Sequence, residues 1–328
     1  MKYAKDTRPK GVANKAAEVL VEALPWIKNI TGKTVVIKYG GSAMVDEQLR
    51  ADVMNDIVLL KIVGVNPVIV HGGGKAITEA MDFLQLPVEF KDGQRVTTPE
   101  AMDLVRTVLM GKVNQELVEA LNEHGNFAVG VSGADAGVIV AEQASPELGR
   151  VGRITRINSP LLDDLVAGDY IPVVASVALG EDGGFYNVNA DMVAGHIAAA
   201  IGAHKVVFLT DVDGLYENFE NKDSLISNLT LCEAQYMVEN NIVSTGMIPK
   251  LKSCIHALDS GVFRAHIING ITPHSLLLEL LTSTGVGTTM HSTEESCTFD
   301  THPLGNFASK LLENRQHAVS AMPNNKIF

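Results

Sequence analysis

Cysteine is scarce in this sequence, which has three among its 328 residues. Cys232, Cys254 and Cys297 are odd in number, lie far apart and include no CxxC pair. This pattern argues against disulfides and against a zinc site, and it is typical of proteins from a reducing compartment. We therefore expect a cytoplasmic protein.

Long apolar runs are absent as well. No stretch approaches the roughly 18 residues that a membrane span needs, and the basic N-terminus has no apolar signal-peptide core before Pro9 and Gly11. We expect no membrane partner. The formal net charge of −12 argues against nucleic acid as the main partner.

The charge is unevenly distributed along the chain. Residues 1–40 hold eight lysines and arginines against three acids, so a basic N-terminal arm precedes an acidic body. Such an arm is either simply solvated or docks on a neighbouring subunit, and the composition leaves both interpretations open.

Apolar residues recur at helical spacing over residues 12–30, where Pro25 should kink or end the helix. Buried-strand patterns then alternate with helical ones, which predicts an α/β fold with a largely parallel sheet. Strands are expected at 34–37, 67–70, 127–131, 171–175, 205–209 and 265–268. Helices are expected at 46–62, 75–85, 98–123, 159–167, 191–201, 231–240, 249–260 and 273–282. Short β-branched segments at 88–97 and 138–157 predict hairpins that form a lid over the sheet edge.

Glycine-rich turns follow the first two strands, Lys38-Tyr39-Gly40-Gly41-Ser42 and His71-Gly72-Gly73-Gly74. Two such turns after adjacent strands, one with a lysine before it, favour phosphate binding over simple tight turns. A Walker A loop is excluded because Ile27 stands where its first glycine must be, and no Rossmann GxGxxG is present in either turn. The G-x-S-x-G nucleophile elbow of esterases is absent too, because Ala134 stands where its last glycine must be.

Three further segments hold residues suited to chemistry. Asn187 and Asp191 alternate with Asn189 on an extended segment, so they can line one surface, although Asp191 could equally cap the following helix. The apolar strand 205–209 ends in the polar pair Thr210-Asp211, and ligands bind at strand carboxyl ends in open α/β sheets. Lys250 follows a turn containing Gly246 and lies in the first turn of a helix, where the helix dipole disfavours it and a functional need would explain it.

Together these motifs resemble the amino acid kinase family, and within it the branch that acts on acetylglutamate rather than carbamate, uridylate or aspartate kinases. The resemblance covers about residues 35–290. Its matching segments are IKYGGSAM (37–44), VIVHGGG (68–74), FKDGQRVT (90–97), YNVNAD (186–191), LTDVDGLY (209–216), STGMIPKL (244–251) and HSLLLELLTSTGVGT (274–288).

The resemblance implies a three-layer αβα sandwich with two lobes, residues 31–201 binding the acyl amino acid and residues 202–290 binding ATP. Residues 1–30 would form a kinked helix for oligomerisation and regulation. The tail at 291–328 has no functional interpretation.

The resemblance also implies an activity, namely ATP-dependent phosphorylation of the side-chain carboxylate of N-acetyl-L-glutamate in arginine biosynthesis. Mg²⁺ would be bound mainly through the nucleotide phosphates rather than by a metal site of the protein. A kinase for another acylated amino acid, such as an acylated aminoadipate, or a non-catalytic sensor of arginine or nucleotide remain alternatives.

Residue roles follow by motif. Lys38 and Lys250 would stabilise the transferred phosphoryl group, with Asp191 organising them. Arg95 would bind the substrate α-carboxylate and Asn187 its other polar groups. Gly40 and Gly41 would bind the phosphoryl group, and Gly73 and Gly74 the substrate. The nucleotide would be bound by Thr210, Asp211 and Gly246.

Regulation is implied by the likeness of the N-terminal helix to that of arginine-inhibited, hexameric members. There L-arginine is the effector and the hexamer is a trimer of dimers, and His266, Glu279 and Gly287 match positions implicated in arginine binding. Three residues depart from the family pattern, namely Lys75 for a usual Pro, Ala134 for a usual Lys and Asn269 for a usual Asp.

Overall fold

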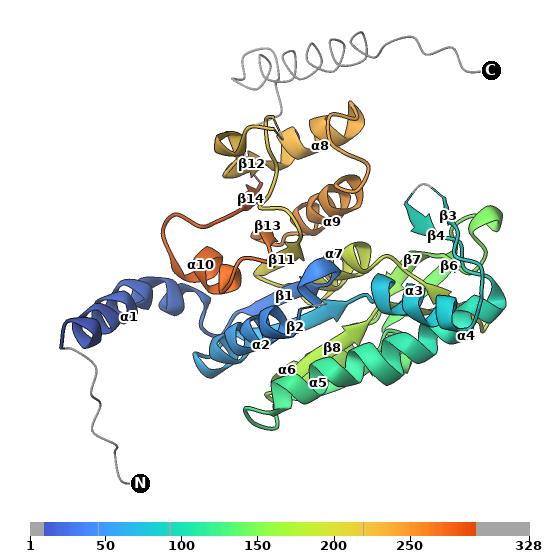
Figure 1. Ribbon diagram of the computed structural model, residues 1–328, viewed down its shortest axis with the longest axis horizontal. Coiled ribbons are helices and arrows are strands. Elements are labelled where there is room, and N and C mark those ends of the chain that lie inside the picture. Colours follow the sequence, from blue (N-terminus) through green and yellow to red (C-terminus); the bar gives the residue numbers. More distant parts are fainter. Residues whose placement is uncertain (1–9, 45, 92, 219, 293–328) are drawn as a thin grey trace.

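The computed structural model describes residues 10–44, 46–91, 93–218 and 220–292. The predictions for residues 1–9 and for the tail beyond residue 292 lie outside this range. Within it, a central sheet of eight strands organises the fold (Figure 1). In sheet order the strands are β12 (Asn228–Thr230), β14 (Thr288–His291), β13 (Arg264–Asn269), β11 (Lys205–Thr210), β1 (Thr34–Tyr39), β2 (Asn66–His71), β8 (Ile171–Ala175) and β5 (Ala128–Ser132).

Neighbouring strands of this sheet are parallel except for the antiparallel pair β13–β14. The predicted mainly parallel sheet is therefore confirmed. Its two halves come from different parts of the chain, because β1, β2, β5 and β8 precede residue 201 and the other four follow it. The boundary between the two expected lobes thus falls between the adjacent strands β1 and β11, while their assignment to substrate and ATP stays a prediction.

Helices cover both faces of the sheet, because alternate strand residues point in opposite directions. Val35 and Ile37 of β1 belong to one buried cluster and Val36 to the other. The first cluster is covered by α2 (Glu47–Ile62), α3 (Gly74–Phe83), α4 (Pro99–Val108), α5 (Gln115–Asn122) and α10 (Ser275–Leu281). The second is covered by α6 (Pro160–Ala167), α7 (Ala190–Ala200), α8 (Leu231–Glu239) and α9 (Ile248–Asp259). The predicted three-layer αβα sandwich is confirmed.

Smaller sheets lie beside the central one. The predicted hairpins exist as β3 (Phe90–Lys91) with β4 (Gln94–Arg95), and as β6 (Ile139–Gln143) with β7 (Gly152–Ile157). The second hairpin joins β9 (Val177–Gly180) and β10 (Phe185–Asn187), two short strands that the sequence pattern did not predict. The lid role of these hairpins stays a prediction.

The N-terminal helix α1 spans Lys10–Ile30 and lies next to α10 at one side of the molecule (Figure 1). It continues past Pro25 to Ile30, so the expectation that the proline could end it is wrong, and the kink stays a prediction. Ile30 is buried at the sheet and Trp26 and Ile27 pack against the same cluster, which anchors the last turn. This packing offsets the backbone hydrogen bond that Pro25 cannot make.

The predicted helix over 98–123 begins as expected, with the Thr98 hydroxyl accepting a hydrogen bond from the Ala101 amide at 3.2 Å. Between α4 and α5, however, it contains a π-helical segment, η2 (Leu109–Asn114). A π turn inserts one residue and re-aims the side chains that follow it. The sequence pattern did not predict this segment.

Cys254 is a buried free thiol. Cys297 lies outside the described residues, so the sequence argument against disulfides stays a prediction, and with it the cytoplasmic localisation. None of the helices within the described ranges is both long and apolar enough to cross a membrane.

Candidate active site

The predicted catalytic residues meet at the carboxyl end of the sheet. Lys38 lies near the end of β1, between neighbours on β2 and β11, so the turns that follow these three strands lie side by side. Asp191 is in the first turn of α7, where Asn189 caps the helix by accepting hydrogen bonds from the Asp191 and Met192 amides. Lys250 is in the first turn of α9, which has no acidic residue there to offset it.

The Asp191 carboxylate lies between the two lysines. Its Oδ1 is 3.0 Å from Nζ of Lys38, and its Oδ2 accepts a hydrogen bond from Nζ of Lys250 at 3.2 Å. Asp191 is buried, and burial by itself would raise its pKa, but the two ammonium groups outweigh that effect and lower the pKa. The carboxylate therefore stays ionised and fixes both lysines.

A hydrogen bond between α7 and α9 holds this geometry. The Ser253 hydroxyl donates to the carbonyl oxygen of Asp191 at 2.5 Å. Ser253 lies one helical turn after Lys250, so the same face of α9 presents both residues to Asp191. Gly195 of α7 permits the close packing, because a Cβ there would lie 2.6 Å from the Ser253 carbonyl oxygen. Sequence reasoning missed Ser253, since no local pattern marks a hydroxyl that pairs 62 residues away.

The glycine turns have steric reasons for their glycines. A Cβ at Gly40 would lie 3.0 Å from Nζ of Lys38, so a side chain there would displace the lysine. Gly41 has a φ of +74°, a left-handed conformation that favours glycine. A Cβ at Gly73 would lie 2.6 Å from Cδ2 of Leu109 in the π segment. Gly74 begins α3 and has open space around it.

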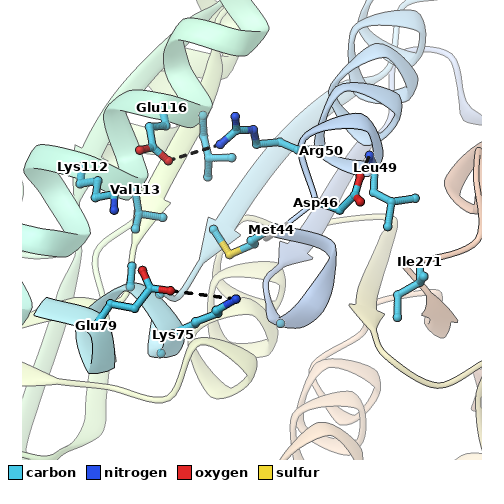
Figure 2. Close-up of a pocket in the computed structure, with 15 residues that line it drawn as sticks. Met44, Asp46, Leu49, Arg50, Lys75, Glu79, Lys112, Val113, Glu116 and Ile271 are labelled. Carbon is cyan, nitrogen blue, oxygen red and sulfur yellow. Dashed lines mark hydrogen bonds and ion pairs between the residues drawn. The ribbon is translucent and has the colours of Figure 1, made fainter. Parts of the chain in front are cut away.

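A cavity of about 940 Å³ opens beside these turns, and Figure 2 shows the side chains that line it. Of the expected site residues in the described ranges, Gly41, Gly73 and Gly74 border it. Two ion pairs cross its walls, with Arg50 Nη1 3.4 Å from Glu116 and Lys75 Nζ 4.0 Å from Glu79. The departure at position 75 thus places a charge at the rim of the cavity. Sequence reasoning did not single out the Arg50 pair, whose partners lie on α2 and α5.

The predicted substrate residues also come together. Nη2 of Arg95 donates to the carbonyl oxygen of Gly74 at 2.9 Å and to the Thr78 hydroxyl at 2.6 Å. Asn187 donates to the Thr97 hydroxyl at 3.2 Å, and that hydroxyl donates to the Arg95 carbonyl oxygen at 3.0 Å. Arg95 is buried, which lowers its pKa, and its guanidinium stacks on the Phe90 ring at 4.7 Å. These contacts connect the β3–β4 hairpin to the glycine turn.

The predicted nucleotide residues are more dispersed. Thr210 and Asp211 lie at the end of β11, with the Thr210 hydroxyl donating to the Asp211 carboxylate at 3.1 Å. Gly246 lies in the turn before α9. Within the described ranges, no hydrogen bond or ion pair joins Asp211 or Gly246 to the lysine pair. The nucleotide-binding role of these three residues stays a prediction.

Asn269, a departure from the family pattern, ends β13 next to this edge. Its Nδ2 donates to Oδ1 of Asp213 at 2.8 Å, and its Oδ1 accepts from the Ile271 amide at 2.9 Å. An aspartate at this position could not donate to Asp213, and the two carboxylates would repel each other. The amide therefore suits this site, and its hydrogen bond contributes to the lowered pKa of Asp213 after that of Tyr216.

The described residues hold no group of three or more His, Cys, Asp or Glu side chains that could bind a metal ion. Asp191 is engaged by two lysines, and Asp213 by Asn269 and Tyr216. These two carboxylates are thus already paired, and the binding of Mg²⁺ through the nucleotide phosphates stays a prediction.

The expected regulatory residues form a second, separate cluster. Nδ1 of His266 lies 2.7 Å from Oε1 of Glu279, and Oε2 of Glu279 accepts from the Val286 and Gly287 amides at 2.7 and 3.2 Å. Burial would raise the pKa of Glu279, but these hydrogen bonds outweigh it and lower the pKa to about 2. Burial also lowers the pKa of His266, so a neutral imidazole donates to an anionic carboxylate.

This cluster borders a cavity of about 110 Å³ together with Trp26 of α1. Lys205 and Arg264 also line it, so groups of both charge signs face the same space. Burial lowers the pKa of Lys205 to about 8. Sequence reasoning placed the effector site near the N-terminal helix but did not single out Trp26 or the two basic residues.

Comparison with known proteins agrees with this geometry. Residues 33–269 match the model of the amino acid kinase family. The acetylglutamate kinase of Caldanaerobacter subterraneus subsp. tengcongensis is 51% identical over 274 residues, which cover 83% of this chain and 92% of that protein. The acetylglutamate kinase of Halothermothrix orenii is 48% identical over 83% of this chain and 96% of that protein.

Among solved structures, N-acetylglutamate synthase from Neisseria gonorrhoeae has the same fold, with a TM-score of 0.75 and 22% identity over 92% of this chain and 70% of that one. The match to the family model spans most of the central sheet, including the glycine turns and the lysine pair. The chain therefore belongs to the amino acid kinase family, in its acetylglutamate kinase branch.

Proposed function

We propose that this protein transfers the γ-phosphoryl group of ATP to the side-chain carboxylate of N-acetyl-L-glutamate, giving N-acetyl-L-glutamyl 5-phosphate in arginine biosynthesis. The single observation that carries the proposal is the Asp191 carboxylate held between Lys38 and Lys250 beside two glycine turns. The identity of about 50% to acetylglutamate kinases supports the choice of acceptor.

The chemistry requires charge stabilisation rather than a base. The acceptor carboxylate has an ordinary pKa of about 4.3, so it is already ionised at pH 7. The barrier is the attack of one anion on another through a transition state that spreads charge over the phosphoryl oxygens. Two lysines held by one aspartate leave a net positive charge there, and fixed amide donors add to it. Mg²⁺, when bound with the nucleotide, neutralises further phosphate charge.

Substrate orientation is assigned to the network around Arg95. Arg95 supplies a positive charge for the α-carboxylate, and the contacts of its Nη2 to Gly74 and Thr78 hold the guanidinium in one orientation. Asn187 and the Gly73 and Gly74 amides would bind the remaining polar groups. Gly40 and Gly41 would contact the phosphoryl group, and Thr210, Asp211 and Gly246 the nucleotide.

Arginine inhibition is proposed at the cavity beside α1. Glu279 supplies a negative charge for a guanidinium or ammonium group, and Lys205 and Arg264 supply positive charges for a carboxylate. A ligand there would contact both α1 and the half of the sheet assigned to ATP, so it could bias their relative arrangement. Exposed Val19, Leu20, Val21 and Leu24 on α1 support pairing of this helix with another copy, in a hexamer built as a trimer of dimers.

A coupled assay for ADP, combined with hydroxylamine trapping of the acyl phosphate, tests the proposal. N-acetyl-L-glutamate should be turned over faster than N-acetylated aminoadipate or N-acetyl-aspartate, with Lys250→Ala as the inactive control. Preference for the longer acid would assign the protein to a different acylated amino acid. Binding of nucleotide or arginine without turnover would identify a sensor instead.

A further inference from the structure

His71, the last residue of β2, is fully buried and uses both nitrogens of its ring. Its Nδ1 lies 3.0 Å from the carbonyl oxygen of Gly72, and its Nε2 lies 3.0 Å from Nδ2 of Asn114. The proposed function assigns no role to His71 or Asn114, although His71 contacts the glycine turn and Asn114 contacts His71.

The hydrogen-bond partners fix the state of the ring. A carbonyl oxygen can only accept, so Nδ1 carries the hydrogen and Nε2 accepts from the Asn114 amide. The second Asn114 amide hydrogen is donated to the carbonyl oxygen of Val173 at 2.8 Å, which fixes the orientation of that amide. Burial lowers the pKa of His71 to about 4, so the ring is neutral at physiological pH.

The π segment explains how Asn114 reaches this position. Asn114 is its last residue and projects toward β2 and β8, where Gly130 of β5 leaves room because a Cβ there would collide with Oδ1 of Asn114. The same segment covers Gly73 through Leu109 and Val113. One irregular turn therefore both holds the His71 ring and packs on the glycine turn that the ring contacts.

The orientation of one peptide group follows. Cis peptide bonds are absent from the described residues, so the amide N–H of Gly73 points opposite to the carbonyl of Gly72. Since that carbonyl is held against the buried ring, the Gly73 N–H points away from the ring, and Gly73 itself borders the cavity. We infer that His71 and Asn114 are positioning residues, which fix the Gly73 amide as a donor to the reacting groups; this inference rests on the proposed function.

Two substitutions at position 71 separate positioning from packing. His71→Phe keeps the ring volume and loses the donor, whereas His71→Asn loses volume and keeps a donor at the δ position. Loss of one preorganised donor costs roughly 100–1000-fold in kcat, so a misaimed one should cost roughly 10–100-fold in His71→Phe. KM for ATP should stay within about threefold, because the affected donor acts on the acceptor side. His71→Asn should recover most of the lost kcat.

Val68→Ala is the matched control, because it removes buried volume from the same strand without touching the turn. It should lower the melting temperature while kcat is retained. Asn114→Leu should reduce kcat less than His71→Phe does, and the double variant should cost little more than His71→Phe alone, since both act through one anchor.

Three outcomes would overturn the positioning role. These are an unimpaired His71→Phe, a His71→Asn that is less active than His71→Phe, and additive losses in the double variant. An inactive wild-type protein would instead overturn the proposed function, and this inference with it. An active wild type with an unimpaired His71→Phe overturns the positioning role alone.

Discussion

Arg95 donates to the carbonyl oxygen of Gly74 across 21 residues, at 2.9 Å, and thereby ties the β3–β4 hairpin to the start of α3. The same nitrogen also donates to the Thr78 hydroxyl. Arg95 is the residue expected to bind the α-carboxylate, and its side chain thus contacts the turn expected to bind the reacting end of the substrate.

Arg95→Lys should raise KM for N-acetylglutamate and leave KM for ATP nearly unchanged. A lysine keeps the positive charge but cannot contact Gly74, Thr78 and a carboxylate in the geometry of the fork. We expect a rise of roughly tenfold or more, equivalent to about 1.4 kcal/mol. Steady-state kinetics with each substrate varied in turn measure both constants. A change confined to the ATP constant would place Arg95 in the nucleotide site.

Lys38→Ala and Lys250→Ala should each lower kcat much more than they raise KM. Each lysine meets charge that grows in the transition state, so we expect a loss of roughly 100–1000-fold in kcat. Removing either lysine also leaves Asp191 with a single cationic partner, so its pKa should move up toward its ordinary value. Lys75→Ala, at the cavity rim, serves as the matched control. Near-normal turnover in either active-site variant would contradict the assignment.

Sequence predicted the fold well where local patterns are strong. Apolar runs of four or five residues bounded by turns identified β1, β2, β5, β8, β11 and β13, and the two glycine turns pointed to the strand ends where the lysines meet. Asp191 could be predicted by motif. The structure shows that Asn189 is the cap of α7, and the catalytic role of Asp191 stays a prediction.

The missed features depend on contacts that leave no local pattern. β10 and β12 have three residues each, too few for any periodicity. The composition of the π segment does not distinguish it from the α-helix around it. Ser253, Arg50 and Trp26 lie next to residues that are far away in the chain. Pro25 does not end α1, because packing carries the helix beyond it to Ile30, and whether it kinks the helix stays a prediction.

Leu20→Glu combined with Leu24→Glu should reduce a hexamer to active dimers. Both side chains are more than 60% exposed on α1, so charges there should not disturb the fold of one subunit but should prevent the apolar stripe from pairing with another copy. Light scattering measures the assembly and the coupled assay the activity. Glu22→Gln on the same helix is the control, and a double variant that remains hexameric would contradict the pairing.

Trp26→Ala should weaken arginine inhibition without lowering kcat in the absence of arginine. Trp26 lines the cavity that holds Glu279, so its removal takes away one wall of the proposed effector site. We expect the half-inhibitory arginine concentration to rise roughly tenfold, the effect of about 1.4 kcal/mol. Phe83→Ala, an exposed aromatic at the end of α3, should leave inhibition unchanged. Full sensitivity in Trp26→Ala would place the effector elsewhere.

Asp56→Asn should change how stability depends on pH. Asp56 of α2 is 1% exposed, and its Oδ1 lies 2.7 Å from Nδ1 of His274 at the start of α10. Burial raises the pKa of Asp56 from 3.8 to about 6, although the hydrogen bond from His274 opposes this, and that bond raises the pKa of His274.

Both groups bind protons more tightly in the folded state than in the unfolded state, so their stabilising contribution is present at low pH and is lost as pH rises. Between about pH 4 and 7 the wild type should therefore lose roughly 1–3 kcal/mol of unfolding free energy relative to Asp56→Asn, which does not titrate. Urea unfolding of both proteins at several pH values measures the difference. His274→Gln retains the titration of Asp56, so its unfolding free energy should fall with pH as steeply as that of the wild type up to about pH 6. Parallel pH curves for wild type and Asp56→Asn would show that this buried carboxyl has an ordinary pKa.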